Sequence, residues 1–203
     1  MQFEPRRIFS DEENLRIMRL KEHVKGKLTI SWMPDGLNGM TFDFTEPDRF
    51  VVAGGCFTSI LLGGKVNDYD LFLLNYDEYF LKNSHLVKQL DEVENKEPGR
   101  FYTFDHANYT KNPNILKTYL DSHSRIQYIF TKYKTRKELV DHFDFVHCSI
   151  SYDLGEDKLY LTREIYDVNM LKKLKVSKTA PFVSQDRIEK FKRRGFHFEA
   201  ERV

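Results

Sequence analysis

Two aspartates one residue apart, Asp68 and Asp70, are the residues of this chain whose types and spacing most clearly suit chemistry. They open an apolar run, residues 70–74, of the kind that forms a buried strand. Side chains at i and i+2 of a strand project from the same face, so the two carboxylates repel each other unless cations neutralise them. Their oxygens suit Mg²⁺, which usually binds one or two carboxylates together with substrate phosphates. Two such ions would clamp the attacking and the leaving oxygens of an in-line displacement.

A glycine pair upstream supplies a place for an anion. Residues 50–53 form a short apolar run that predicts a buried strand, and Gly54 and Gly55 end it with a turn that lets a ligand approach the main chain closely. Residues 59–62 then indicate a short helix. The N–H groups at the start of that helix have no partner within it and point back towards the glycines, which favours a phosphate there.

These parts, in this order, resemble the signature of the DNA polymerase beta-like nucleotidyltransferase superfamily. The closest likeness is to the head domain of tRNA CCA-adding enzymes and bacterial poly(A) polymerases. The matching residues are Gly54-Gly55, Leu61-Leu62-Gly63 and Asp68-Tyr69-Asp70.

The resemblance implies an α+β fold with a mixed β-sheet flanked by helices. It also implies two Mg²⁺ ions as cofactors, held by Asp68 and Asp70, and a nucleoside triphosphate as the donor. Other superfamily members have a serine near the glycines, so Thr58 or Ser59 would contact phosphate oxygens beside the Gly54-Gly55 turn.

The superfamily usually has a third carboxylate on a later strand, and Asp144 is the candidate here. It lies in residues 143–152, a run rich in aromatic and β-branched residues that predicts a strand. In the family this carboxylate would bind one metal ion and accept the proton of the attacking hydroxyl as a general base. Asp141 and Asp153 are the rivals, one in a predicted helix and the other at a turn. Residues 143–148 also resemble a run in small phage-type members of the superfamily.

Composition sets broad bounds. With 203 residues, of which 40% are hydrophobic, the chain suffices for a single nucleotidyltransferase-like domain over residues 1–203. No apolar run approaches the roughly 20 residues of a membrane span, and the N-terminus lacks the apolar stretch of a signal peptide. Two cysteines, Cys56 and Cys148, suggest neither a disulfide framework nor a zinc cluster, so a cytoplasmic location is expected.

The net charge of +1 argues neither for nor against nucleic acid, but the charge is unevenly distributed. Residues 171–194 carry many basic side chains, opposed only by Asp186 and Glu189. We expect a basic helical C-terminal segment from about residue 165. It would hold an RNA backbone or the triphosphate, or else form an ordinary solvated face. The basic residues are Lys172, Lys173, Lys175, Lys178, Arg187, Lys190, Lys192, Arg193 and Arg194.

Periodicity and turn residues predict the remaining elements. The other expected strands are residues 27–33, 101–104, 125–131 and 159–161, with a turn at residues 34–36. The expected helices are residues 11–25, 77–97, 113–123 and 136–142, and the chain from residue 165 onward, broken around Pro181. His106 and Asn108 are expected in a loop that contacts a base or acceptor or only forms a turn, and Trp32 is expected in the core.

Three functions follow. The first is a Mg²⁺-dependent nucleotidyltransferase that passes a nucleoside monophosphate from a triphosphate to an acceptor, which is RNA, a protein or a small molecule. The second is an inactive protein of the same fold that binds RNA or a protein partner through its basic segment. The third is a toxin- or antitoxin-type nucleotidyltransferase that modifies tRNA or a protein side chain.

Overall fold

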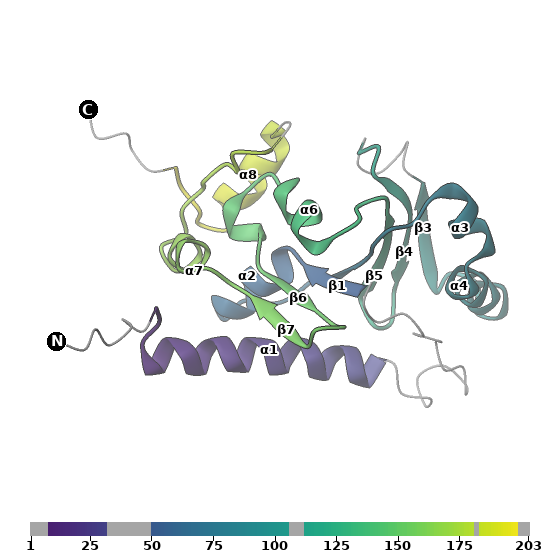
Figure 1. The fold of residues 1–203 in the computed structure, drawn as a ribbon, viewed down its shortest axis with the longest axis horizontal. Coiled ribbons are helices and arrows are strands. Elements are labelled where there is room, and N and C mark those ends of the chain that lie inside the picture. The colour runs from purple at the N-terminus through teal and green to yellow at the C-terminus, as the bar shows by residue number, and fades with distance from the viewer. Residues whose placement is uncertain (1–7, 32–49, 106–111, 181–182, 199–203) are drawn as a thin grey trace.

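A computed structural model describes the arrangement of most of the chain (Figure 1). The described residues form one mixed sheet with helices on both of its faces, in the order β3-β4-β5-β2-β1-β6-β7. The described ranges are 8–31, 50–105, 112–180 and 183–198.

Seven strands make the sheet. β2 and β5 run parallel, whereas every other neighbouring pair is antiparallel. The strands are β1 (Phe50–Ala53), β2 (Tyr69–Leu73), β3 (Phe101–Asp105), β4 (Ile115–Asp121), β5 (Ile126–Thr131), β6 (Ser151–Asp153) and β7 (Lys158–Tyr160).

Helices lie on both sides of the sheet, and Figure 1 shows α1 on the side opposite α6 and α8. The helices are α1 (Asp11–Ser31), α2 (Gly55–Leu61), α3 (Glu78–Asn83), α4 (His85–Lys96), α6 (Arg136–Asp141), α7 (Arg163–Met170) and α8 (Gln185–Arg193), with a 3-10 turn, η3 (Val146–Cys148). None of the described helices is long and apolar enough to cross a membrane.

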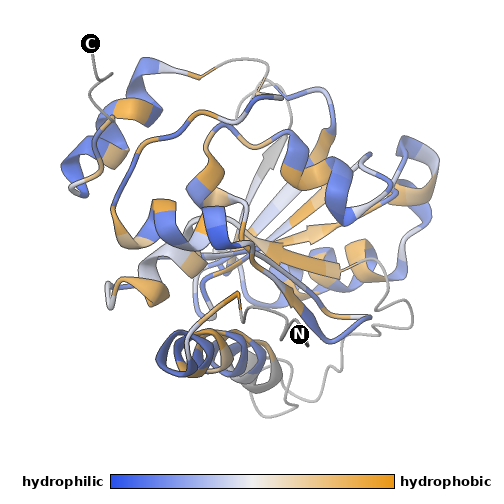
Figure 2. Cartoon of the chain, turned by 60° about the vertical axis from the view of Figure 1, so that its left-hand side comes forward, coloured by the Kyte–Doolittle hydropathy of each residue, from blue (hydrophilic) through white to orange (hydrophobic). Residues whose placement is uncertain are grey.

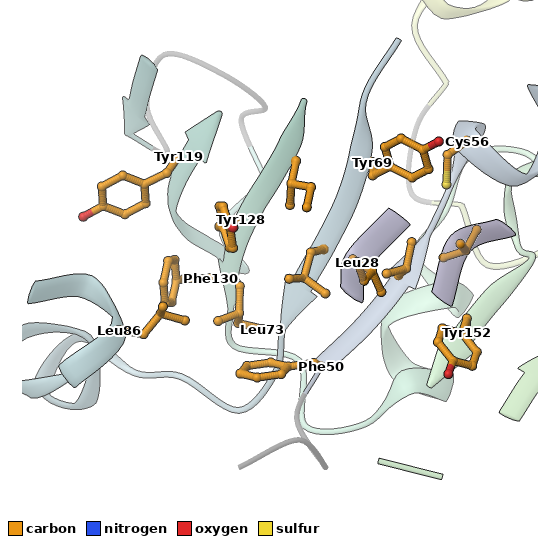
Figure 3. Packing of buried hydrophobic residues seen from close by; sticks show 14 of the residues in the cluster. Leu28, Phe50, Cys56, Tyr69, Leu73, Leu86, Tyr119, Tyr128, Phe130 and Tyr152 are labelled. Carbon is orange, nitrogen blue, oxygen red and sulfur yellow. The ribbon is translucent and has the colours of Figure 1, made fainter. Parts of the chain in front are cut away.

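The main core lies between one face of the sheet and α1, α2 and α4. Leu20, Val24 and Leu28 of α1, spaced four residues apart, are almost fully buried in it. That spacing keeps one face of the helix on the sheet over successive turns. Figure 3 shows members of this core, from Tyr128 and Phe130 on β5 to Leu28 on α1.

The other face of the sheet packs against α6. Val51, Phe72 and Ile129 project to this side and form a second core with Leu139 of α6. Because the central strands are covered on both faces, they are apolar along most of their length. Figure 2 shows these strands largely in orange, with blue hydrophilic residues on the outer sides of the helices.

The predicted α+β fold with a mixed sheet flanked by helices is confirmed. The strands predicted at residues 50–53, 101–104 and 125–131 are present as β1, β3 and β5, and the helix at residues 136–142 is present as α6. The predicted helix over residues 77–97 is divided into α3 and α4, because Ser84 accepts a hydrogen bond from Val87 N and caps a new helix.

Four predicted elements are wrong within the described residues. The segment from residue 165 onward is not helical over residues 171–180, because α7 ends at Met170 and α8 begins only at Gln185. The strand at residues 27–33 is helical as far as Ser31, because burial of Leu28 extends the apolar stripe of α1. The helix at residues 113–123 is strand β4, which pairs with β3 on one side and β5 on the other. Residues 143–152 contain a loop and η3 before β6 begins at Ser151, so Asp144 is not on a strand.

Several sequence predictions fall outside the described residues. These are the turn at residues 34–36, His106, Asn108, Trp32 and the break at Pro181.

Candidate active site

The Gly54-Gly55 turn lies directly against Asp70. β1 and β2 pair so that Ala53 is opposite Asp70, which brings the residue after β1 to the start of β2. Gly54 has φ 97° and ψ −151°, a conformation that essentially only glycine adopts. A Cβ atom at this position would also lie 3.1 Å from Asp70 Oδ2. Glycine is therefore needed here for its backbone conformation and for the close approach.

Asp68 and Asp70 line a cavity of about 200 Å³ together with Gly54, Gly55 and Ser59. Among the described residues, none donates a hydrogen bond to either carboxylate. Burial, and then the charge of Asp68, raise the pKa of Asp70 to about 7, while two cations on α8 partly offset the effect. The site therefore holds two neighbouring carboxylates, and the ionisation of Asp70 is opposed in the absence of a cation.

Three basic side chains of the C-terminal segment line the same cavity. Arg187, Lys190 and Arg194 are three and four residues apart, so they share one side of α8 and its C-terminal cap. Ser184 caps the start of this helix by accepting a hydrogen bond from Arg187 N. The sequence indicated a basic segment as a whole. The helical spacing of Arg187, Lys190 and Arg194 is what distinguishes these three residues from the neighbouring lysines.

An aromatic cluster around His147 holds α8 in place. The His147 ring is fully buried, with its centroid 4.3 Å from that of Phe191 and 4.4 Å from that of Phe196. Within the described part of the chain, neither ring nitrogen has a hydrogen-bond partner. Burial lowers the pKa of His147 to about 4, the nearby Arg187 and Arg194 also lower it, and Asp144 raises it. The ring is therefore neutral near pH 7.

Thr58 lies outside the cavity, in contrast to Ser59. Its hydroxyl is buried and donates a hydrogen bond of 3.0 Å to the carbonyl of His147. The Asn169 side-chain amide donates to the same oxygen at 3.1 Å. The Ser59 hydroxyl donates to the Gly55 carbonyl at 3.0 Å and stays at the cavity wall. Thr58 thus joins α2 to η3, and Ser59 is the hydroxyl at the cavity.

Asp144 is paired with Arg187 and does not itself line the cavity. Arg187 Nε donates to Asp144 Oδ2 at 2.6 Å and Arg187 Nη2 donates to Asp144 Oδ1 at 2.9 Å. Its rivals also lie away from the cavity, since Asp141 pairs with Lys137 and Asp153 accepts a hydrogen bond from Glu156 N. Asp144, the carboxylate expected on a later strand, is therefore found beside Arg187 of α8 instead.

Gln127 is a cavity residue that sequence reasoning missed. It is 3% exposed, lies on β5 and is the direct partner of Asp70 in the parallel pairing with β2. A glutamine inside an apolar strand carries no recognisable motif. Only the pairing of two strands far apart in the sequence could have identified it.

The donor atoms of the cavity fit a hard divalent cation. Carboxylate and amide oxygens are typical Mg²⁺ ligands, and Asp68, Asp70 and Gln127 supply them. Cys56 and Cys148 also line the cavity, but burial raises the pKa of both thiols and keeps them protonated. The described residues contain no cluster of three or more His, Cys, Asp or Glu side chains that could hold a metal ion. Such an ion would need oxygens from a substrate or water as well.

A family assignment comes from the sequence match over residues 26–172, where the chain fits the sequence model of the Gabija anti-defense 2 family. The chain belongs to this family. The match runs from α1 to the end of α7, so α8 with its basic residues lies beyond the part that defines the Gabija anti-defense 2 assignment. No curated protein matches the chain.

One solved structure shows the fold independently of the sequence match. The "Thermotoga maritima CCA-adding enzyme complexed with tRNA_CCA" aligns with 96% of this chain and 44% of its own, at a TM-score of 0.53 and 17% identity. A CCA-adding enzyme in apo form I aligns with 75% of this chain and 36% of its own (TM-score 0.49, 17% identity). A tRNA nucleotidyltransferase complexed with a primer tRNA and an incoming ATP analog aligns with 63% and 35% (TM-score 0.40, 14% identity).

This member of the Gabija anti-defense 2 family thus has a nucleotidyltransferase-like fold, as the Gly-Gly and Asp-x-Asp motifs predicted. The chain spans less than half the length of the CCA-adding enzymes that it resembles.

Proposed function

We propose that this protein is a Mg²⁺-dependent nucleotidyltransferase that transfers a nucleoside monophosphate from a nucleoside triphosphate to an acceptor hydroxyl. One observation carries the proposal. Two carboxylates without hydrogen-bond donors among the described residues, Asp68 and Asp70, share a single cavity with three basic side chains of α8. Carboxylates suit the metal ions and the basic side chains suit the phosphates, so one cavity offers both halves of a metal–triphosphate site.

Each part of the cavity has a separate task in this proposal. Mg²⁺ held by Asp68 and Asp70 would neutralise negative charge that develops on the reacting phosphate, usually the largest contribution in such chemistry. The tight turn at Gly54 and Gly55 lets phosphate oxygens approach the main chain, and Ser59 offers a hydroxyl beside it.

The basic side of α8 supports binding of the triphosphate. Arg187, Lys190 and Arg194 face the cavity, where they would pair with phosphate oxygens and with the departing pyrophosphate. The acceptor hydroxyl gives its proton to water as its oxygen attacks the α-phosphorus, the bond from that phosphorus to the bridging oxygen breaks, and pyrophosphate leaves. Asp144 acts through Arg187 in this scheme, because its two oxygens already accept the Arg187 hydrogen bonds.

The cavity size indicates which part of the nucleotide is enclosed. Its volume of about 200 Å³ is below the roughly 300–1,000 Å³ of pockets that enclose a whole small molecule. We therefore assign it to the ions and the phosphates, with the ribose and base towards its opening. The acceptor is RNA, a protein or a small molecule, and RNA has the additional support that the CCA-adding enzyme of similar fold is complexed with tRNA.

Calorimetric titration of each nucleoside triphosphate, with and without Mg²⁺, tests the site. We expect binding that depends on Mg²⁺ in the wild type and is lost in the Asp68→Asn, Asp70→Asn double variant. The matched control is Asp141→Asn, Asp167→Asn, which removes two half-exposed carboxylates on α6 and α7. Unchanged binding in the Asp68, Asp70 variant would refute the proposal.

Transfer of label from an α-³²P nucleotide to total RNA or protein separates catalysis from binding. The second function, nucleotide or RNA binding without transfer, is favoured by one observation: the cavity residue beside Asp70 is the amide Gln127 and not a third carboxylate. Metal-dependent binding without any labelled product would support that second function over the first.

A further inference from the structure

Gln127 lies where the cavity is most acidic. In the parallel pairing of β2 with β5 it is the direct partner of Asp70, and paired residues of neighbouring strands project from the same face of a sheet. Gln127 is 3% exposed and lines the cavity with Asp68 and Asp70. Its side chain is thus directed at the same space as the two carboxylates.

The amide of Gln127 has no hydrogen-bond partner among the described residues. The amide atoms are not among the enclosed and unpaired side-chain atoms of the described residues, so they are accessible at the cavity that Gln127 lines. A ligand bound in the cavity can therefore contact the amide directly. The amide oxygen is a neutral hard donor for a divalent cation, and the amide N–H groups can donate to a phosphate oxygen.

The charges around the cavity limit what binds there first. Asp68 and Asp70 are opposed by Lys190 and Arg194, neither of which pairs with a carboxylate of the described residues, while Arg187 is paired with Asp144. Gln127 adds no negative charge. The positive charges in the cavity lining therefore offset the negative ones, which weakens the attraction for a divalent cation that arrives alone. A triphosphate adds several negative charges of its own and so strengthens that attraction.

We propose that Gln127 is the third metal-site residue of this protein, a neutral amide beside Asp70, and that the cavity consequently holds a divalent ion firmly only together with a nucleoside triphosphate. This inference rests on the proposed function. In this inference the cavity residues determine the order of binding. The ion and the triphosphate enter as one complex, and the neutral side chain of Gln127 makes the affinity for the ion alone low.

Mn²⁺ binding measured by electron paramagnetic resonance tests this, because the signal of free aqueous Mn²⁺ falls as the ion binds. Wild-type protein is titrated without nucleotide and with α,β-methylene ATP, which does not transfer its nucleotide. Mn²⁺ binding by the analogue alone is subtracted. We expect Mn²⁺ to bind the wild type at least tenfold more tightly when the analogue is present.

Two variants isolate Gln127. Gln127→Glu adds the missing charge, and we expect it to bind Mn²⁺ without the analogue at least tenfold more tightly than the wild type. Gln127→Met keeps a similar length without polar atoms and should lose most of the tightening that the analogue produces. Far-UV circular dichroism and the thermal midpoint confirm that each variant is folded before its binding is compared. Gln127→Glu keeps the test decisive if Gln127→Met does not fold.

The results that overturn the inference differ from those that overturn the proposed function. Equal Mn²⁺ affinity with and without the analogue in the wild type, or unchanged affinity in Gln127→Glu, refutes the role of Gln127. If the Asp68→Asn, Asp70→Asn variant binds Mn²⁺ and the analogue as the wild type does, the metal site itself is refuted. Loss of binding in that double variant, with Gln127 variants that match the wild type, refutes only the inference made here.

Discussion

Lowering the pH from about 7.5 to about 5 is expected to destabilise this protein by about 2 kcal/mol through one side chain, His147. Its ring is fully buried among Phe145, Phe191 and Phe196, and within the described part of the chain it has no hydrogen-bond partner. Phe191 belongs to α8, so protonation of His147 would disturb the contact that holds the basic side chains at the cavity.

The magnitude follows from the two pKa values of this histidine. Burial lowers the pKa of His147 to about 4 in the folded protein, against an ordinary value of 6.5. Between these values only the unfolded state takes up the proton, so stability falls as the pH falls through this window. The full difference is worth about 3 kcal/mol at about pH 4, and about two thirds of it is already lost at about pH 5.

Urea unfolding followed by far-UV circular dichroism at both pH values measures the effect. His147→Phe is the matched variant, because a phenyl ring fits the apolar surroundings and cannot be protonated. Carboxylates elsewhere also titrate, so the quantity of interest is the difference in pH dependence between the two proteins. We expect the variant to lose about 2 kcal/mol less than the wild type. Equal losses in the two proteins would refute the reasoning.

Three further predictions concern the cavity. Gly54→Ala should destabilise the protein by at least about 2 kcal/mol in urea unfolding, because Gly54 has a φ of 97° and the added Cβ would lie against Asp70. The control is Gly63→Ala, at φ 68°, where an added Cβ would have no neighbouring atom within 4 Å. That variant should cost only about 1 kcal/mol. Asp70→Asn should stabilise the metal-free protein above pH 7 by up to about 4 kcal/mol. The pKa of Asp70 is raised in the folded protein, so stability that is present at low pH is lost as the pH rises through about 7. An unchanged midpoint of urea unfolding would contradict this prediction. Asp144→Asn should weaken nucleotide binding about tenfold in calorimetry, because Arg187 loses its charged partner. Mn²⁺ binding without nucleotide should stay as in the wild type. A parallel loss of Mn²⁺ binding would instead make Asp144 a metal ligand.

The sequence by itself determined the part of the site whose residues are close together along the chain. The order strand, Gly-Gly turn, short helix, loop and strand could be read from residues 50–74, because each element there has a strong local signal. That order sufficed to predict the nucleotidyltransferase-like fold and to bring Gly54, Gly55, Asp68 and Asp70 to one cavity. A turn between two paired strands leaves few alternatives for the residues beside it.

Tertiary structure overrode local preference elsewhere. The predicted helix over residues 113–123 became β4, because hydrogen bonds to β3 and β5 are available on both of its sides. The predicted strand over residues 143–152 gave way to η3, where Val146 N bonds to the Lys175 carbonyl and the His147 ring is enclosed by aromatic residues from the C-terminal segment. These partners are distant in sequence, so no local pattern contains them.

The rest of the cavity was decided by the tertiary structure alone. Gln127 reaches Asp70 only through the parallel pairing of β5 with β2. Arg187 and Lys190 reach the cavity only because Phe191, the residue after Lys190 on α8, packs onto the His147 ring, and the same packing brings Arg187 to Asp144. Residue type and spacing predict which chemistry is available, but long-range packing decides which side chains share a cavity, because strand pairing and helix docking join segments that have no local signal in common.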